Sequence, residues 1–297
     1  MQQTKKSGKN GVRQRYYCYI CKKTFEEGSG KQYDNLWELY QNGKQTYAQL
    51  ADYFKVSKRT IQRQLDKIKP QTLPEGIIGN HRVCVLMDTT YFGRGFGLML
   101  FKDAYSGRNL YYMFVKHEAI FLYEQGLDKL KELGYEIVGI VCDGKPGLLK
   151  LYPNIPTQMC QFHQVAIVRR YLSRNPKLLA SKELWELTQT LCRTDKESFV
   201  GGLADWYAKW ESFLGERTPK MEGQKSTYKH KKLRSAYLSL KRNLPFLFIW
   251  YDNIELNIPN TTNAIDGFFA DLKNKLRCHN GLTNKRKVKF IRGFLKA

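Results

Sequence analysis

The sequence predicts an α/β protein preceded by a small helical DNA-binding domain. Two apolar, β-rich runs, 82–88 and 136–143, each end in an aspartate and predict buried strands. A long region, 165–251, shows helical periodicity only. A chain of 297 residues can hold one large domain with appendages, or two domains. These observations together favour a mixed α/β core with a large helical segment.

The N-terminal part of the chain predicts a basic arm and then a helix-turn-helix. Residues 1–34 are a basic, Gly-containing stretch around YYCYICKKTF, and residues 35–70 show helical spacing on both sides of a turn. Ser57 is placed to cap the second helix. The outer face of that helix carries Lys58, Arg59, Gln62 and Arg63. This face favours DNA recognition over an ordinary helical pair.

The rest of the chain can be divided by its periodicity, after a Pro/Gly-rich linker at 69–81. The predicted strands are 82–88, a hairpin over 96–116 that turns at 103–107, 136–143, and a short strand at 157–160. Helices are predicted from about 119, from His163, through 165–251 with a basic interruption at 215–226, and at 263–277 and 284–295. Asn280 and Gly281 separate the last two helices.

The formal charge of +23 is concentrated in three segments. Residues 1–70 carry 15 Lys and Arg against 6 Asp and Glu, residues 217–234 carry 7 against 1, and residues 266–297 carry 9 against 2. Three basic surfaces on a nearly neutral body favour a nucleic acid as partner over a merely solvated surface. No apolar run approaches a membrane span, and the polar N-terminus is unlike a secretory signal, so the expected location is cytoplasmic.

Asp88 and Asp143 share one setting, at the point where a predicted strand leaves the sheet. Open α/β sheets bind ligands beyond the carboxyl ends of their strands, so two acids there could share divalent cations. The alternative is that both are ordinary turn residues, and Asp143-Gly144 is a strong turn signal. The residues alone leave the two interpretations about equal.

Asp266 also has two interpretations. If Asn263 caps the helix 263–277, Asp266 is the third helical residue and can reach back to the cap. It also shares a helix face with Lys273 and Arg277, which suits phosphodiester chemistry. On these grounds capping is slightly favoured over a metal-binding role.

Two cysteine motifs are candidate metal ligands. Cys160 and His163 form a C-x2-H pair at a spacing suited to one metal, although a buried cysteine and a helix-start histidine are the ordinary interpretation. Cys18 and Cys21 are half of a four-cysteine zinc ribbon, so a complete zinc site there would need ligands from elsewhere.

Taken together, the motifs resemble those of bacterial insertion-sequence transposases of the Mutator-like group. The resemblance covers residues 16–295 and rests on MDTTYFGRGFGLMLFKDAYSG, VCDGKPGLL, CQFH seventeen residues after Asp143, and NTTNAIDGFFADLKNKLRCHNGL. It implies a ribonuclease-H-like core in two parts, 71–164 and 256–297, interrupted by an all-helical insertion at 165–255. In this group the third acid is typically Glu, whereas this chain has Asp266, and only half of the group's N-terminal zinc ribbon is found.

The resemblance implies that Asp88, Asp143 and Asp266 bind two Mg²⁺ or Mn²⁺ ions, and that Cys160 and His163 match the group's C-x2-H motif, with Zn²⁺ as an alternative metal. The implied reaction is cleavage and strand transfer at the terminal repeats of an insertion element. The implied partners are double-stranded DNA and further copies of the chain, as a dimer or larger assembly. Residues expected to contact phosphates are Lys145, Lys273, Arg277, Lys285, Arg286 and Lys287.

Two rival functions follow from the same residues. One is a transposase-derived, sequence-specific DNA-binding protein without turnover, which the shorter acid at Asp266 favours. The other is a metal-dependent nuclease that hydrolyses DNA without joining it. An RNA-directed role is disfavoured because no recognised base-stacking motif is found.

Overall fold

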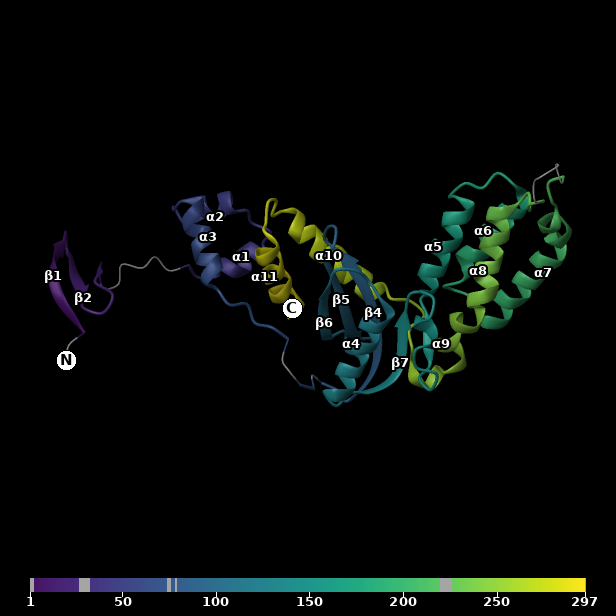
Figure 1. Cartoon of the computed structure of the whole chain (residues 1–297), viewed down its shortest axis with the longest axis horizontal. Coiled ribbons are helices and arrows are strands. Elements are labelled where there is room, and N and C mark those ends of the chain that lie inside the picture. Colours follow the sequence, from purple (N-terminus) through teal and green to yellow (C-terminus); the bar gives the residue numbers. More distant parts are fainter. Residues whose placement is uncertain (1–2, 27–32, 74–75, 78, 220–225, 297) are drawn as a thin grey trace. The chain divides into compact units, whose positions relative to one another are not determined.

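The computed structural model describes residues 3–26, 33–73, 76–77, 79–219 and 226–296 (Figure 1). The chain forms two compact units. The first comprises Met1–Lys69 with Cys278–Gly281, and the second comprises Pro70–Arg277 with Leu282–Ala297.

The basic arm of the first unit contains a three-stranded antiparallel sheet that the sequence did not predict. Strands β1 (Thr4–Asn10), β2 (Arg13–Cys18) and β3 (Thr24–Glu26) pair in that order. Tyr16 lies opposite Phe25, and their rings stack with centroids 5.7 Å apart. Such cross-strand aromatic pairs stabilise short strands.

Among its described residues this unit also has the helices α1 (Leu36–Gln41), α2 (Tyr47–Tyr53) and α3 (Lys58–Lys67). The two helices predicted around a turn are α2 and α3. Ser57 caps α3 as predicted, because its side chain accepts a hydrogen bond from the Thr60 N–H. Leu50 of α2 and Ile61 of α3 are both fully buried, so the pair has a core of its own.

A mixed five-stranded sheet is the centre of the second unit, and the strand order is β6-β5-β4-β7-β8. The antiparallel strands are β4 (Arg82–Tyr91), β5 (Gly97–Asp103) and β6 (Asn109–Val115). Strand β7 (Glu136–Cys142) pairs parallel to β4, and β8 (Thr157–Met159) pairs parallel to β7. The α/β class predicted from the sequence is confirmed.

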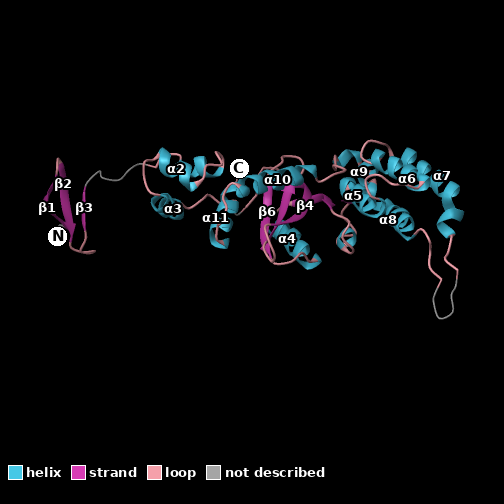
Figure 2. Ribbon diagram, turned by 90° about the horizontal axis from the view of Figure 1, so that it is seen from above, coloured by secondary structure: helices cyan, strands magenta, loops and turns pink. Residues whose placement is uncertain are grey.

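Helices cover both faces of this sheet (Figure 2). On one face, α4 (Ile120–Glu132) packs Tyr123 and Leu127 among Val85, Met87 and Phe101. On the other face lies α10 (Asn263–Arg277), and α11 (Asn284–Leu295) lies beside the edge strand β6; the bounds of both helices match the prediction. Because both faces are covered, every residue of β5 is buried.

The helical part of the unit comprises α5 (Gln161–Leu172), α6 (Leu179–Thr190), α7 (Lys196–Gly215), α8 (Lys231–Leu247) and α9 (Ile249–Asp252). Two short 3-10 helices, η1 (Leu148–Lys150) and η2 (Ile254–Leu256), lie outside it. Its core is a separate apolar cluster that includes Phe199, Trp206 and Leu240. Part of the basic interruption predicted at 215–226 lies outside the described residues.

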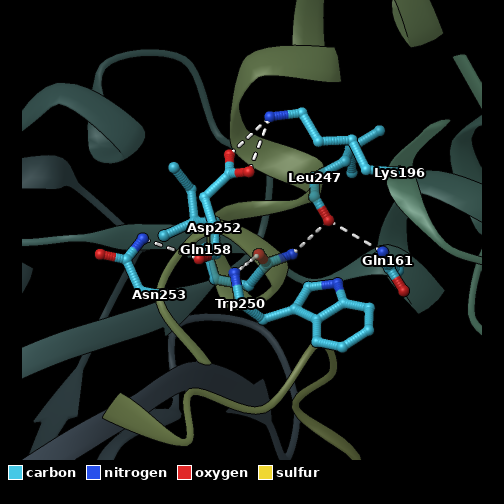
Figure 3. A network of polar contacts seen from close by, with 8 residues as sticks. Gln158, Gln161, Lys196, Leu247, Trp250, Asp252 and Asn253 are labelled. Carbon is cyan, nitrogen blue, oxygen red and sulfur yellow. Dashed lines mark hydrogen bonds and ion pairs between the residues drawn. The ribbon is translucent and has the colours of Figure 1, made fainter. Parts of the chain in front are cut away.

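A buried polar network fastens this helical part to the sheet (Figure 3). The side-chain amides of Gln158 and Gln161 both donate to the Leu247 carbonyl, at 2.9 and 2.8 Å. The Trp250 N–H donates to Gln158 Oε1 at 3.0 Å. Both glutamines are fully buried, and these bonds satisfy their two side-chain NH2 groups and Gln158 Oε1, which would otherwise be costly to bury. In the described part of the chain, no helix has the length and apolar character of a membrane span.

Gly126 of α4 provides a test of the packing between this helix and the sheet. A Cβ at this position would lie 2.0 Å from the buried ring of Phe101, so Gly126→Ala forces the helix and the strand apart. We expect the free energy of unfolding, measured in urea, to fall by about 1–3 kcal/mol.

The matched control is Gly201→Ala, on an exposed turn of α7 where a Cβ meets nothing within 4 Å. This change should raise the free energy of unfolding by roughly 0.5–1 kcal/mol, because alanine has the higher helix propensity. Equal effects of the two substitutions would contradict the described packing of α4.

Candidate metal centre

Asp88 lies inside β4, and not at the end of the strand as the sequence predicted. Strand β4 continues to Tyr91 because β5 still pairs with it, and Asp88 faces Leu100 in that ladder. The parallel pairing of β4 with β7 ends earlier, at Leu86 and Val141. Asp88 therefore lies just beyond the carboxyl end of β7, where the sheet is open on one side. Its Oδ1 accepts a hydrogen bond of 2.7 Å from the Thr89 N–H.

Asp266 is carried by the first turns of α10, and its role in the cap differs from the prediction. The helix begins at Asn263, so the residue before it is Thr262, whose carbonyl accepts from the N–H groups of Ile265 and Asp266. Asp266 is thus the fourth helical residue, and the capping box predicted around Asn263 is wrong. The Thr262 hydroxyl lies 3.4 Å from Asp266 Oδ2.

His163 is in the first turn of α5, next to the segment that leads into α10. The Gln161 N–H donates to the Asn260 carbonyl at 2.9 Å. The N–H and hydroxyl of Thr262 both approach Cys160 Sγ at 3.3 Å. A hydroxyl has one hydrogen, so Thr262 can donate to Cys160 or to Asp266 at any one time. These contacts place the start of α10 against the start of α5.

Asp88, His163 and Asp266 converge, with one ligand atom from each lying within 4.8 Å of the others. This group could hold a metal ion. Donors on opposite sides of an ion, each about 2.1 Å away, are about 4.2 Å apart, so small side-chain shifts would close the site. His163 Nδ1 is buried and has no hydrogen-bond partner among the described residues, so this nitrogen is available to bind a ligand.

The pKa values of Asp88, His163 and Cys160 are shifted by burial and by their neighbours, often in opposite directions. Burial raises the pKa of Asp88 to about 7, although the Thr89 N–H and His163 lower it. The neighbouring Cys160 sulfur raises the pKa of His163 to about 9, against the effect of burial. Burial disfavours the Cys160 thiolate, but His163 and Thr262 lower the pKa of Cys160 overall. A divalent cation would displace protons from Asp88 and His163.

Asp143 directly follows β7 as predicted, but it is not one of the three convergent ligands. Its Oδ1 accepts a 3.0 Å hydrogen bond from the Lys145 N–H. Burial raises the pKa of Asp143, and charge interactions connect it with His163 and with Asp88. Asp143 is therefore close enough to influence the cluster electrostatically. Cys160 is also outside the convergent group. The third member of that group is His163, where the sequence suggested Asp143.

Glu118 is an acidic residue near the cluster that the sequence did not predict. The buried Tyr123 hydroxyl donates to Glu118 Oε1 at 2.7 Å and lies 2.9 Å from Thr89 Oγ1. The Lys145 ammonium donates to the Glu118 carbonyl at 3.0 Å and pairs with its Oε2 at 3.4 Å. The only signal in the sequence is that Glu118 stands before a predicted helix. Lys145 is the residue that the sequence predicted to contact phosphate, and in the structure its ammonium group interacts with Glu118.

The remaining predicted residues are distributed over both units. In the first unit, Lys58, Arg59 and Arg63 are exposed on α3, and Arg59 lies 3.4 Å from Gln62 Oε1. Cys18 and Cys21 belong to no group of three or more potential ligands among the described residues, and hydrogen bonds to Cys21 lower the pKa of Cys18. In the second unit, Arg277 and Lys285 are exposed, whereas Lys273, Arg286 and Lys287 are half-buried.

Comparisons with known proteins do not identify the chain. Neither the models of protein families nor the curated proteins contain a match to this sequence. The functional assignment therefore depends on the residues and on their arrangement.

The raised pKa values predict a pH-dependent metal affinity. Between pH 6 and pH 8 the ionised fraction of Asp88 rises roughly tenfold, so Mn²⁺ affinity measured by titration calorimetry should rise by about that factor or more. In the absence of metal, the free energy of unfolding changes with pH in the opposite direction to the metal affinity. The folded state holds a proton on Asp88 that the unfolded state has lost, so stability falls as pH rises from about 4 to about 7.

Asp88→Asn should remove most of the Mn²⁺ binding, whereas Asp271→Asn should leave both the affinity and its pH dependence unchanged. Asp271 is an exposed acid on the same helix as Asp266, so it controls for net charge. An affinity for Mn²⁺ that is constant from pH 6 to pH 8 would show that Asp88 is not a ligand.

Proposed function

We propose that this protein is a metal-dependent DNA transposase that cleaves the ends of an insertion element and joins them to target DNA. One observation carries the proposal. Two aspartates and a histidine from β4, α10 and α5 converge beside the carboxyl end of a parallel strand, in a chain with a formal charge of +23. A site for a cation within a strongly basic protein suits a reaction on a polyanion.

The architecture supports this proposal over a plain nucleic-acid-binding module. The mixed five-stranded sheet, with α4 and α10 on its two faces, is compatible with a ribonuclease-H-like core. A large helical part separates β8 from α10 in the sequence. Hydrolysis alone does not need such an addition, which favours strand transfer over simple nuclease activity.

In this proposal Asp88 and Asp266 hold the cation through carboxylate oxygens, and His163 adds one nitrogen. The donor set suits Mn²⁺ as well as Mg²⁺, because imidazole is a better ligand for transition metals than for Mg²⁺. The bound metal would supply Lewis-acid stabilisation of the phosphate and activation of the attacking oxygen. Asp143 adds a carboxylate beside the cluster, where we place a second ion once DNA contributes its own oxygens.

The position of Asp266 bears on whether this copy is active. An aspartate is one methylene shorter than the glutamate that the resemblance implies. In the structure the Asp266 carboxylate nevertheless comes within 4.8 Å of its partners on β4 and α5. This reach favours a working enzyme over a disabled copy that retains DNA binding alone.

Recognition of DNA is assigned to surfaces outside the cluster. We propose that the exposed basic face of α3 reads the terminal repeats, as in other helix-turn-helix proteins. Lys273 and Arg277, about two and three turns further along the helix that carries Asp266, would stabilise the charge of DNA phosphates. The two ends of an element must be held together, so we expect a dimer or larger assembly on DNA.

A cleavage and strand-transfer assay tests the proposal. The substrate is DNA that carries both ends flanking the gene, and Mg²⁺ and Mn²⁺ are compared. We expect nicked and joined products from the wild-type chain, and from Asp266→Glu. Asp88→Asn should lower the rate by on the order of 10² or more, because the cation loses a charged ligand.

Asp271→Asn again serves as the control and should leave the rate unchanged. Each alternative outcome assigns a different function. Cleaved but unjoined products would make the protein a nuclease, and specific end binding without cleavage would make it a DNA-binding protein.

A further inference from the structure

Helix α5 connects the candidate metal centre to a second site. His163 is in its first turn, and Tyr171 and Leu172 at its other end line a cavity of about 640 Å³. The loop 173–178, the start of α6 and the start of α8 form the other walls. Gln158 and Gln161 both donate to the Leu247 carbonyl, which joins the N-terminal end of α5 to the end of α8. Helix α5 is therefore a rigid connection between the two sites.

The chemistry of this cavity is that of an anion site. Lys177, Lys231 and Lys232 line it and are exposed, and no ion pair among the described residues involves them. No acidic residue lines it in the described part of the chain. Glu216 offsets only Lys229, at 3.3 Å, and His230.

The backbone adds to this positive field. Helices α6 and α8 both begin at the cavity, and neither has a side-chain cap on its first N–H groups. The positive ends of their dipoles therefore add to the lysine charges. Lysine is unfavourable at a helix N-terminus, so three lysines at the starts of two helices are poorly placed for stability. Their placement suits an anionic ligand instead.

The length of α5 fixes how far this cavity is from the metal centre. Leu172 follows His163 by nine residues, which at 1.5 Å per residue is about 14 Å. A strand of DNA advances 3.4 Å along the duplex axis per nucleotide, so for a duplex whose axis runs along α5, 14 Å corresponds to about four base pairs. A duplex with one phosphate at the metal centre can therefore present phosphates of the same DNA at the cavity.

We propose that this cavity, the α5 phosphate cleft, binds the backbone of duplex DNA about four base pairs from the phosphate held at the metal centre. The inference rests on the proposed function for the identity of the DNA. It adds a contact that sets the register of cleavage, because α5 holds the cleft and His163 at a fixed separation.

The test removes the positive charges of the cleft lysines in the protein and the negative charge of single phosphates in the DNA. The cleft variant is Lys177→Gln/Lys231→Gln/Lys232→Gln, and removing lysines from helix N-termini should not impair folding. The control is Lys131→Gln/Lys150→Gln/Lys241→Gln, three exposed lysines outside the cleft with the same change in charge. Binding to end-containing duplexes is measured by fluorescence anisotropy across a salt series, with a methylphosphonate replacing one phosphate at a time.

We expect the cleft variant to bind on the order of tenfold more weakly near 150 mM salt, with a log–log salt slope shallower by about 2–3. Methylphosphonates three to five base pairs from the cleavage position should weaken binding several-fold for the wild type and for the control. The cleft variant should be insensitive at these positions and remain sensitive elsewhere.

Two results would contradict the proposal that the α5 phosphate cleft binds DNA. One is equal affinity and an equal salt slope for the cleft and control variants, and the other is an unchanged methylphosphonate pattern in the cleft variant. Failure of the proposed function is recognised separately, because the wild type would then bind the duplexes without cleaving them, or not bind at all.

Discussion

The candidate site depends on one junction, the contact between Cys160 and Thr262. These residues are 102 positions apart, and the N–H and hydroxyl of Thr262 both approach the Cys160 sulfur. A second bond, from the Gln161 N–H to the Asn260 carbonyl at 2.9 Å, joins the same two segments. This junction holds the start of α10 beside the start of α5, so that Asp266 and His163 lie close together. The buried sulfur therefore acts as a structural acceptor, while its neighbour in the C-x2-H motif belongs to the metal cluster.

The second constraint is the set of buried glutamine side chains at the N-terminal end of α5. Gln164 continues the series begun by Gln158 and Gln161, since it donates to Ser239 at 3.1 Å and accepts from Asn243 at 2.7 Å. Buried amides specify one arrangement, because a shifted helix would leave their donors and acceptors unpaired. The two cores of the second unit, one under the sheet and one among the helices, are thus joined in a defined geometry. That geometry holds α5, with His163 in its first turn, in a fixed position between the sheet and the helical part.

Periodicity in the sequence predicted the elements well and the site less completely. The hairpin of β5 and β6, the strand β7 and the helices α10 and α11 follow from local patterns, because each is set by its own apolar spacing. The sheet of the basic arm escaped prediction, since short strands with one stacked aromatic pair have almost no periodic signal.

The convergence of ligands could not be read from local patterns. Asp88 was expected at a strand end, but pairing with β5 extends β4 beyond it, which is a long-range effect. Asp266 was expected in a capping box, but Thr262 takes the capping position. His163 replaces Asp143 in the cluster because the Thr262 junction, and not the spacing along the chain, decides which side chains meet. Glu118 belongs to no sequence motif, and its position is known only from its contacts with Tyr123 and Lys145 in the structure.

The most direct test of the central claim is electron spin-echo modulation of Mn²⁺ bound to protein labelled with ¹⁵N-histidine. Five histidines are present, and only one that coordinates the ion gives strong modulation. We expect a single directly bound histidine nitrogen, whose signal persists in His117→Gln, an exposed control, and disappears in His163→Gln. Bound Mn²⁺ with no histidine coupling, or with coupling that survives His163→Gln, would contradict the assignment of Asp88, His163 and Asp266 as the metal centre.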